Sequence, residues 1–246
     1  MYISAFPIPP SPKYFRRSIA LHHNHSELYS NMSTGLLFVT APEADYKAIN
    51  EILLHLRDWE YGGGADRFRL VTTKNAYDLD GPATPLRPRT QAADETSPRL
   101  SSDLDNTWAG AALEDVEAFC LDLTRDTSEQ SNRYNSSLYV VVDSTDLQAR
   151  SCILGERAVD EEAEEFTWLD SFNKMRIPWD KLYLTWCNLD IANMNFEEFT
   201  QEEEDGGEGV DGWFTFKDVS DGDDLSEDNR RKRDREIQRF RDKGHI

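Results

Sequence analysis

Polar and indole side chains that could hold a ligand occur in two separate parts of the sequence. They are Asp143, Thr145, Trp186, Asn188, Asp190 and Asn193. Asp143 and Thr145 directly follow residues 138–142, the most β-rich run of the chain. Ligands of sheets that have flanking helices bind outside the carboxyl ends of the strands. We therefore expect a ligand or partner to bind near Asp143, with the loop that follows Trp186 closing over it.

The residues after Trp186 also have a structural interpretation. Asn and Asp in tight loops often bond to nearby backbone groups, as helix caps and turn formers. Asn188, Asp190 and Asn193 fit that role as well as they fit ligand binding. The structural interpretation is favoured, because Asn and Asp in a tight loop often serve as caps and turn formers.

The sequence offers little for catalysis or for metal binding. Glu197, Glu198, Glu202 and Glu203 have helical spacing, but no histidine accompanies them and no calcium-binding loop is present. Ser144 is not in a GxSxG elbow, and His55 is the one histidine inside the expected domain. We therefore expect no Ser-His-acid triad, no metal site and no cofactor.

Short apolar runs alternate with amphipathic stretches along the chain. We expect strands at residues 36–39, 68–72 and 138–142, a helix from a capping box at residues 40–43 to about Trp59, and a second helix at residues 108–123. This alternation predicts an α/β fold with a small, mainly parallel sheet and flanking helices. Two further strands, at 152–154 and 174–177, are expected to pair antiparallel across an acidic excursion over residues 156–170. Residues 213–216 are expected to dock as an edge strand, residues 179–186 to form a short helix, and Phe196 and Phe199 to be buried anchors.

The composition predicts one folded domain with polar additions. Residues 1–31 are rich in proline and are expected to be a disordered N-terminal extension. Residues 32–216 form the expected α/β domain, with a disordered insertion at about 76–105. Residues 217–246 form a charged C-terminal tail, which we expect to be mobile and dispensable for stability; its basic run could serve as a nuclear signal.

Charge and cysteine content narrow the class of protein. The net charge is −20, which disfavours binding to nucleic acid and to anionic lipid. No apolar run is long enough for a membrane span. The three cysteines, Cys120, Cys152 and Cys187, show no disulfide or metal-ligand spacing, and this indicates a reducing compartment. We expect a cytoplasmic location, with nuclear entry left open.

Two runs of the sequence resemble a known family. NLDIANMNFEEF, residues 188–199, and VVVDSTDL, residues 140–147, are similar to motifs of the bacterial and fungal family called domain of unknown function 6924. The resemblance covers most of the chain between Met32 and Phe199. Because that family has no established activity, the resemblance implies no function.

Two functions stay open at this point. The first is a non-catalytic protein-interaction or accessory domain, which is favoured because no titratable pair with a recognisable spacing is present. The alternative is a small enzyme or accessory factor of specialised metabolism that binds a small molecule near Asp143 and Asn188. A protein partner fits the first; the sequence does not determine an oligomeric state.

Overall fold

The computed structural model describes residues 33–61, 64–75, 105–125, 134–160, 163, 167–201, 210–219 and 225–246. The predicted N-terminal extension and nearly all of the predicted insertion lie outside these residues, as do Glu202 and Glu203. The described residues all belong to one compact unit, Ser33–Ile246. No helix among them is both long enough and apolar enough to cross a membrane.

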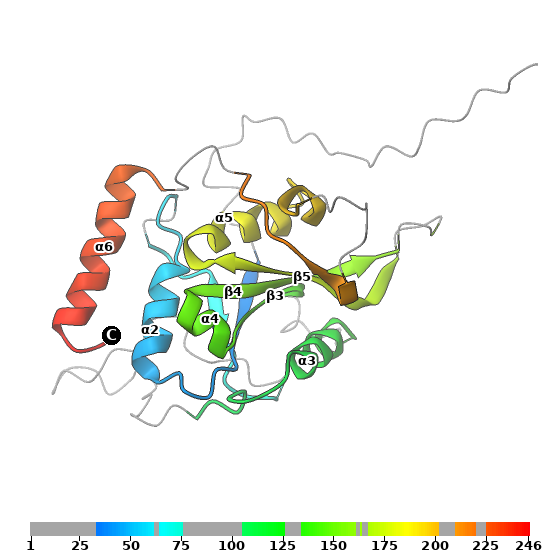
Figure 1. Cartoon of the computed structure of the whole chain (residues 1–246), viewed down its shortest axis with the longest axis horizontal. Coiled ribbons are helices and arrows are strands. Elements are labelled where there is room, and N and C mark those ends of the chain that lie inside the picture. The colour runs from blue at the N-terminus through cyan, green and yellow to red at the C-terminus, as the bar shows by residue number, and fades with distance from the viewer. Residues whose placement is uncertain are drawn as a thin grey trace, which may run out of the picture. The chain divides into compact units, whose positions relative to one another are not determined.

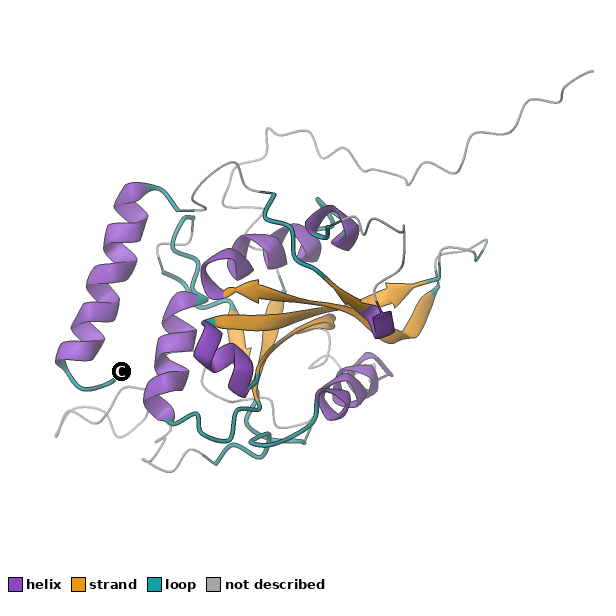
Figure 2. Cartoon of the chain, viewed as in Figure 1, coloured by secondary structure: helices purple, strands orange, loops and turns teal. Residues whose placement is uncertain are grey.

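A six-stranded mixed sheet forms the centre of this unit (Figure 2), and its strand order is β2-β1-β3-β4-β5-β6. The strands are β1 Thr34–Val39, β2 Phe68–Leu70, β3 Tyr134–Val142, β4 Ser151–Val159, β5 Trp168–Pro178 and β6 Trp213–Phe214. β1 is parallel to both β2 and β3, and β6 is parallel to β5. β4 is antiparallel to both of its neighbours. The predicted α/β class is therefore confirmed, and so is the antiparallel pairing of residues 152–154 with residues 174–177.

Helices lie on both sides of the sheet (Figure 1). They are α2 Tyr46–His55, α3 Leu113–Arg125, α4 Ser144–Ala149, α5 Trp179–Asp190 and α6 Glu227–Asp242, with the 3-10 helices η2 Phe196–Phe199 and η3 Val210–Gly212. Phe119 of α3 packs with Phe38 of β1 and with Trp108, both edge to face. Trp186 of α5 covers Phe68 of β2 with ring centroids 5.1 Å apart. α3 and α5 thus each bury an apolar stripe against a strand.

β4 and β5 are longer than the sequence pattern indicates. They pair from Ser151 with Pro178 as far as Val159 with Trp168. Both ends of the predicted acidic excursion at 156–170 are therefore sheet, since residues 156–159 belong to β4 and residues 168–170 to β5. The predicted bounds of the loop are wrong at both ends. The acidic and polar residues of this hairpin are tolerated because β5 is exposed from Trp168 to Ser171.

The C-terminal segment is not the mobile tail that its charge predicts. α6 lies beside α2 (Figure 1), and its Ile237 and Phe240 are buried against Leu54 and Trp59. These two apolar side chains are three residues apart, so they fall on one face of the helix. The many charges of this segment predict a solvated tail, but burial of Ile237 and Phe240 is enough to dock the helix.

Candidate functional site

Asp143 lies at the carboxyl end of β3 and caps α4, a helix that the sequence analysis did not predict. Its Oδ1 accepts a hydrogen bond from the Asp146 backbone N–H at 2.8 Å, and Asp146 Oδ2 accepts one from the Asp143 N–H at 3.4 Å. This reciprocal arrangement is a capping box. Its signal is in the sequence, because Asp146 follows three positions after Asp143, the residue directly after the strand.

Arg176 of β5 joins both carboxylates of this cap. Its Nη2 lies 2.7 Å from Asp143 Oδ2, and its Nη1 lies 2.6 Å from Asp146 Oδ1. Ser151 Oγ also donates to Asp146 Oδ1, at 2.6 Å. All four carboxylate oxygens of Asp143 and Asp146 therefore have partners within the domain. This arrangement fixes α4 to β4 and β5. Because both carboxylates are already paired inside the domain, neither is well placed to bind a ligand or to transfer a proton.

The two carboxyl groups differ in their electrostatic environments. Burial raises the pKa of Asp146, and the hydrogen bonds from Ser151 and Arg176 offset only part of that effect. Burial also acts to raise the pKa of Asp143, but the Arg176 guanidinium and the Asp146 N–H together lower it below its usual value. Arg176 is in turn held in its charged form, chiefly by its hydrogen bond to Asp143.

Asp190 lies at the other end of the sheet. Its carboxylate accepts hydrogen bonds from Ser33, just before β1, and from the amide of Asn135 at the start of β3. α5 begins beside the carboxyl end of β3, where the Trp179 N–H donates to Arg150 O. Over its 12 residues it runs about 18 Å. The expectation that this segment closes over Asp143 is therefore wrong, because the helix carries the loop away from it.

The remaining predicted site residues have local roles. Asn193 donates to Asn188 Oδ1 at 2.8 Å, and Asn188 donates to the Leu184 carbonyl at 2.9 Å, so both close the end of α5. Trp186 is fully buried in the core, above Phe68. Thr145 is exposed on α4. The structure thus brings Asp143 close to Thr145, and Asn188 close to Asn193, but it does not bring the two groups together.

The residues of a conceivable Ser-His pair have other partners. Ser144 Oγ donates to Glu43 at 2.8 Å, whereas His55 Nε2 lies 2.7 Å from a guanidinium nitrogen of Arg150. Burial, and then the charge of Arg150, lower the pKa of His55 to about 4. Its imidazole is therefore neutral and accepts a hydrogen bond from the arginine.

Metal binding and cavities give no further support to a site at these residues. Within the part of the chain that the structure describes, no group of three His, Cys, Asp or Glu side chains could hold a metal ion. An open groove runs along α6, and a hollow with about 150 Å³ of empty volume lies beside Leu53. Neither of these two hollows is lined by Asp143 or by Asn188.

Comparison with known proteins identifies no relative. The chain matches no family model, no curated protein and no solved structure. The resemblance of residues 140–147 and 188–199 to the family of unknown function remains a prediction. In the structure these two runs form the end of β3 with α4, and the end of α5 with η2.

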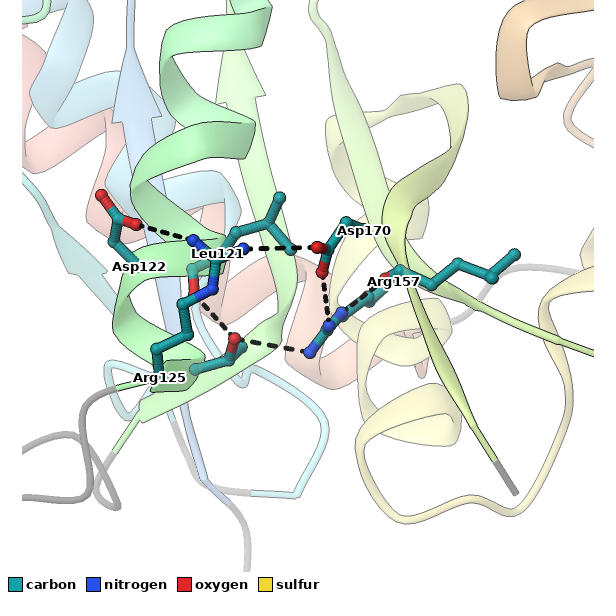
Figure 3. A network of polar contacts seen from close by, with 7 residues as sticks. Leu121, Asp122, Arg125, Arg157 and Asp170 are labelled. Carbon is teal, nitrogen blue, oxygen red and sulfur yellow. Dashed lines mark hydrogen bonds and ion pairs between the residues drawn. The ribbon is translucent and has the colours of Figure 1, made fainter. Parts of the chain in front are cut away.

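A polar network that the sequence analysis missed joins α3 to the β4–β5 hairpin (Figure 3). Arg157 of β4 donates to the Leu169 carbonyl at 2.7 Å and pairs with Asp170 at 2.9 Å. Arg125 of α3 reaches the second oxygen of Asp170, at 3.3 Å, and Arg157 also reaches Thr124 at 3.4 Å. The network escaped notice because residues 156–170 were interpreted as a loop.

Beside this network two large apolar side chains are exposed. Trp168 is 39% exposed and Leu169 is 40% exposed. Among the described residues, five large apolar side chains are classed as exposed, and these two are the ones that are adjacent in sequence. Within the described residues, β5 pairs with β6 only at Lys174 and Met175. At Trp168 and Leu169 the neighbouring strand of β5 is therefore β4 only.

Glu156 of β4 is the carboxyl group with the most strongly raised pKa in the described part of the chain. Burial, and then the charge of Glu197 on η2, raise its pKa from 4.5 to about 8. The native state thus holds this proton more tightly than the unfolded chain does. Its contribution to stability is complete below about pH 4.5 and is lost as the pH rises through 8.

We expect Glu156→Gln to stabilise the protein at pH 8 to 9 and to have little effect near pH 4. The gain in unfolding free energy at alkaline pH should be about 1 to 3 kcal/mol, after a discount for the partial exposure of the side chain. Urea unfolding at both pH values measures it. Glu197→Gln, which removes only the second cause, should give a smaller gain of the same sign. If Glu156→Gln and wild type have the same unfolding free energy at pH 9, this account is contradicted.

Proposed function

We propose that this chain is a non-catalytic protein-interaction domain that binds its partner through the Trp168–Leu169 end of the β4–β5 hairpin. The observation that carries the proposal is the adjacent exposed pair on a hairpin held by buried and charged contacts. Tryptophan is enriched among residues that dominate interface energies. Successive side chains of a strand point to opposite faces, so Trp168 and Leu169 offer apolar surface on both faces of this end of the hairpin. The Trp168 ring also lies 5.9 Å from the Arg157 guanidinium, which helps to hold it in place.

The network beneath the pair supports this role. The Arg157 side chain is only 14% exposed and joins two strands and a helix through Leu169, Asp170 and Thr124. The hairpin is therefore fixed before binding, so less conformational entropy is lost when a partner docks. The alternative, a small-molecule site near Asp143 and Asn188, has less support because those residues lie at opposite ends of the sheet.

We also propose that the protein acts inside the cell. Cys120, Cys152 and Cys187 are free thiols, and the first two are buried. Unpaired buried thiols fit a reducing compartment, where disulfides are rare. Nucleic acid is disfavoured as a partner by the net charge of −20. For nuclear entry, a transport receptor would have to bind the basic residues of α6, either while α6 is docked on α2 or after α6 has left it.

Site-specific cross-linking tests the proposed surface. A photo-reactive amino acid at position 169 should give a discrete cross-linked product in extracts of the cells that make the protein. The matched control is position 191, since Ile191 is 44% exposed and lies at the end of α5. Equal labelling from both positions, or none from position 169, would count against the hairpin as the binding surface.

A further inference from the structure

α6 is a helix of almost entirely polar composition. Of its 16 residues, two are buried, Ile237 and Phe240. They pack on Leu54 and Trp59, with Leu225 and Ile246 partly buried around them. Figure 1 shows α6 beside α2, which stands between it and the sheet. The apolar contact of α6 with the rest of the domain is therefore small, and local opening of a helix is easier when few buried apolar contacts are lost.

The surface under α6 is built without any contribution from α6. Trp59 Nε1 donates to the Leu54 carbonyl at 2.7 Å, which fixes the indole ring. Gly64, at φ +93°, packs beneath the same ring, and a Cβ there would lie 2.9 Å from it. Contacts with Leu54 and Gly64, neither of which belongs to α6, therefore position the Trp59 ring.

Polar groups of the same surface meet both ends of the helix. The Glu60 carboxylate accepts the Ser226 N–H at 2.8 Å and the Asn229 amide at 3.1 Å, at the amino end of α6. At the other end, the Asn50 amide donates to the His245 carbonyl at 2.9 Å. A carboxylate at a helix N-terminus is favourable because of the helix dipole. The surface thus distinguishes the two ends of a helix.

Charge complementarity defines which helix fits. Glu51 of α2 lies 3.8 Å from Arg241 of α6 and also pairs with Arg150 at 3.1 Å. Glu60 is a second carboxylate of this surface, and its pKa is lowered by the hydrogen bonds from Ser226 and Asn229 and then by the charge of Lys232 on α6. The surface therefore favours a helix that carries arginine or lysine around an apolar pair three residues apart.

We propose that Asn50, Leu54, Trp59 and Glu60 form a helix-recognition seat, and that α6 occupies it as a detachable ligand from the same chain. α6 leaves the seat as a unit while the sheet stays folded. Release exposes both the seat and the basic residues of α6. This function is separate from that of the hairpin, because α6 packs on α2 and not on β4 or β5.

Hydrogen exchange on the full chain tests the first half of the proposal. Amides of residues 230–241 should exchange at least about tenfold faster than those of β3, since α6 opens without global unfolding. In Phe240→Ala, exchange of α6 should accelerate at least about tenfold more while β3 stays unchanged. Equal rates for α6 and β3 in wild type, or global unfolding of Phe240→Ala, would show that α6 is an integral part of the fold and would overturn the proposal.

A peptide of residues 225–246 tests the second half. Labelled peptide should bind full-length Ile237→Ala/Phe240→Ala at least about tenfold more tightly than wild type, whose seat is occupied. The same peptide carrying Phe240→Asp should not bind. The Trp168→Ala/Leu169→Ala chain with α6 disabled should still bind it, which separates this proposal from the hairpin. No binding to the α6-disabled chain, or equal binding to wild type, would refute the seat.

Discussion

Phe196→Ala should lower the free energy of unfolding by about 3 to 5 kcal/mol, the cost typical of truncating a buried phenylalanine. Phe196 is buried in η2, and its ring meets that of Phe214 on β6 at 5.6 Å, edge to face. Removing the ring leaves a cavity and weakens the contact with the edge strand. Urea unfolding at neutral pH measures the loss. Phe199→Ala should fall in the same range, because Phe199 is buried too.

The control for this pair is Ile191→Ala, five positions before Phe196 and 44% exposed. It should change the unfolding free energy by less than about 0.5 kcal/mol, as surface substitutions usually do. This contrast tests whether the phenylalanines of the motif stabilise the domain. Melting temperatures of both phenylalanine variants close to that of wild type would show that the rings are not anchors, and would return the motif to a binding role.

Arg176→Ala should lower the free energy of unfolding by about 2 to 4 kcal/mol. Removing one partner from a fully buried ion pair costs about 3 to 5 kcal/mol, because the other charge is left in a poor environment. Asp146 is fully buried, but Arg176 is 38% exposed at its side chain, so the lower range applies. Chemical unfolding at pH 7 measures the loss.

The pH dependence of this loss has a definite sign. Burial already raises the pKa of Asp146, and removing the guanidinium raises it further. Protonation then neutralises the unpaired carboxylate, so the deficit of Arg176→Ala relative to wild type should shrink as the pH falls from 7 toward 4. Asp146→Asn in the same chain should restore part of the stability at pH 7. Lys74→Ala, at a pair in which both side chains are about half exposed, should cost less than about 1 kcal/mol. A deficit that does not change with pH would contradict the buried-charge explanation.

The α/β class could be predicted because the central strands are short apolar runs separated by amphipathic stretches. Leu36 to Val39 and Leu138 to Val142 are buried over their whole lengths, as continuous apolar runs in a parallel sheet should be. β4 and β5 were harder to predict, since only their inner halves are buried. The outer halves of β4 and β5 contain charged residues such as Arg157 and Asp170. Backbone pairing between the two strands, and not the hydropathy of these residues, makes them part of the sheet.

The arrangement of the candidate site could not be predicted because it depends on the length and direction of α5. Asp143 and Asp190 could be predicted as polar residues at the ends of elements. Their separation could not, because it follows from a helix that continues to Asp190, beyond the expected end at 186. Their partners are also distant in sequence: Arg176 for Asp143, and Ser33 for Asp190. No local pattern marks such contacts. A helix running to Phe240 could be predicted, but its docking could not, because only two buried residues of α6 determine it among many charges.

The most direct test of the proposed function is the affinity of the partner cross-linked from position 169. Trp168→Ala/Leu169→Ala should weaken binding of that partner at least about tenfold, as expected when anchor residues are truncated. Its melting temperature should stay within about 2 °C of wild type, because both side chains are exposed. Ile191→Ala should bind as wild type does. An affinity unchanged by the double substitution, or lowered equally by Ile191→Ala, would contradict a binding surface on the β4–β5 hairpin.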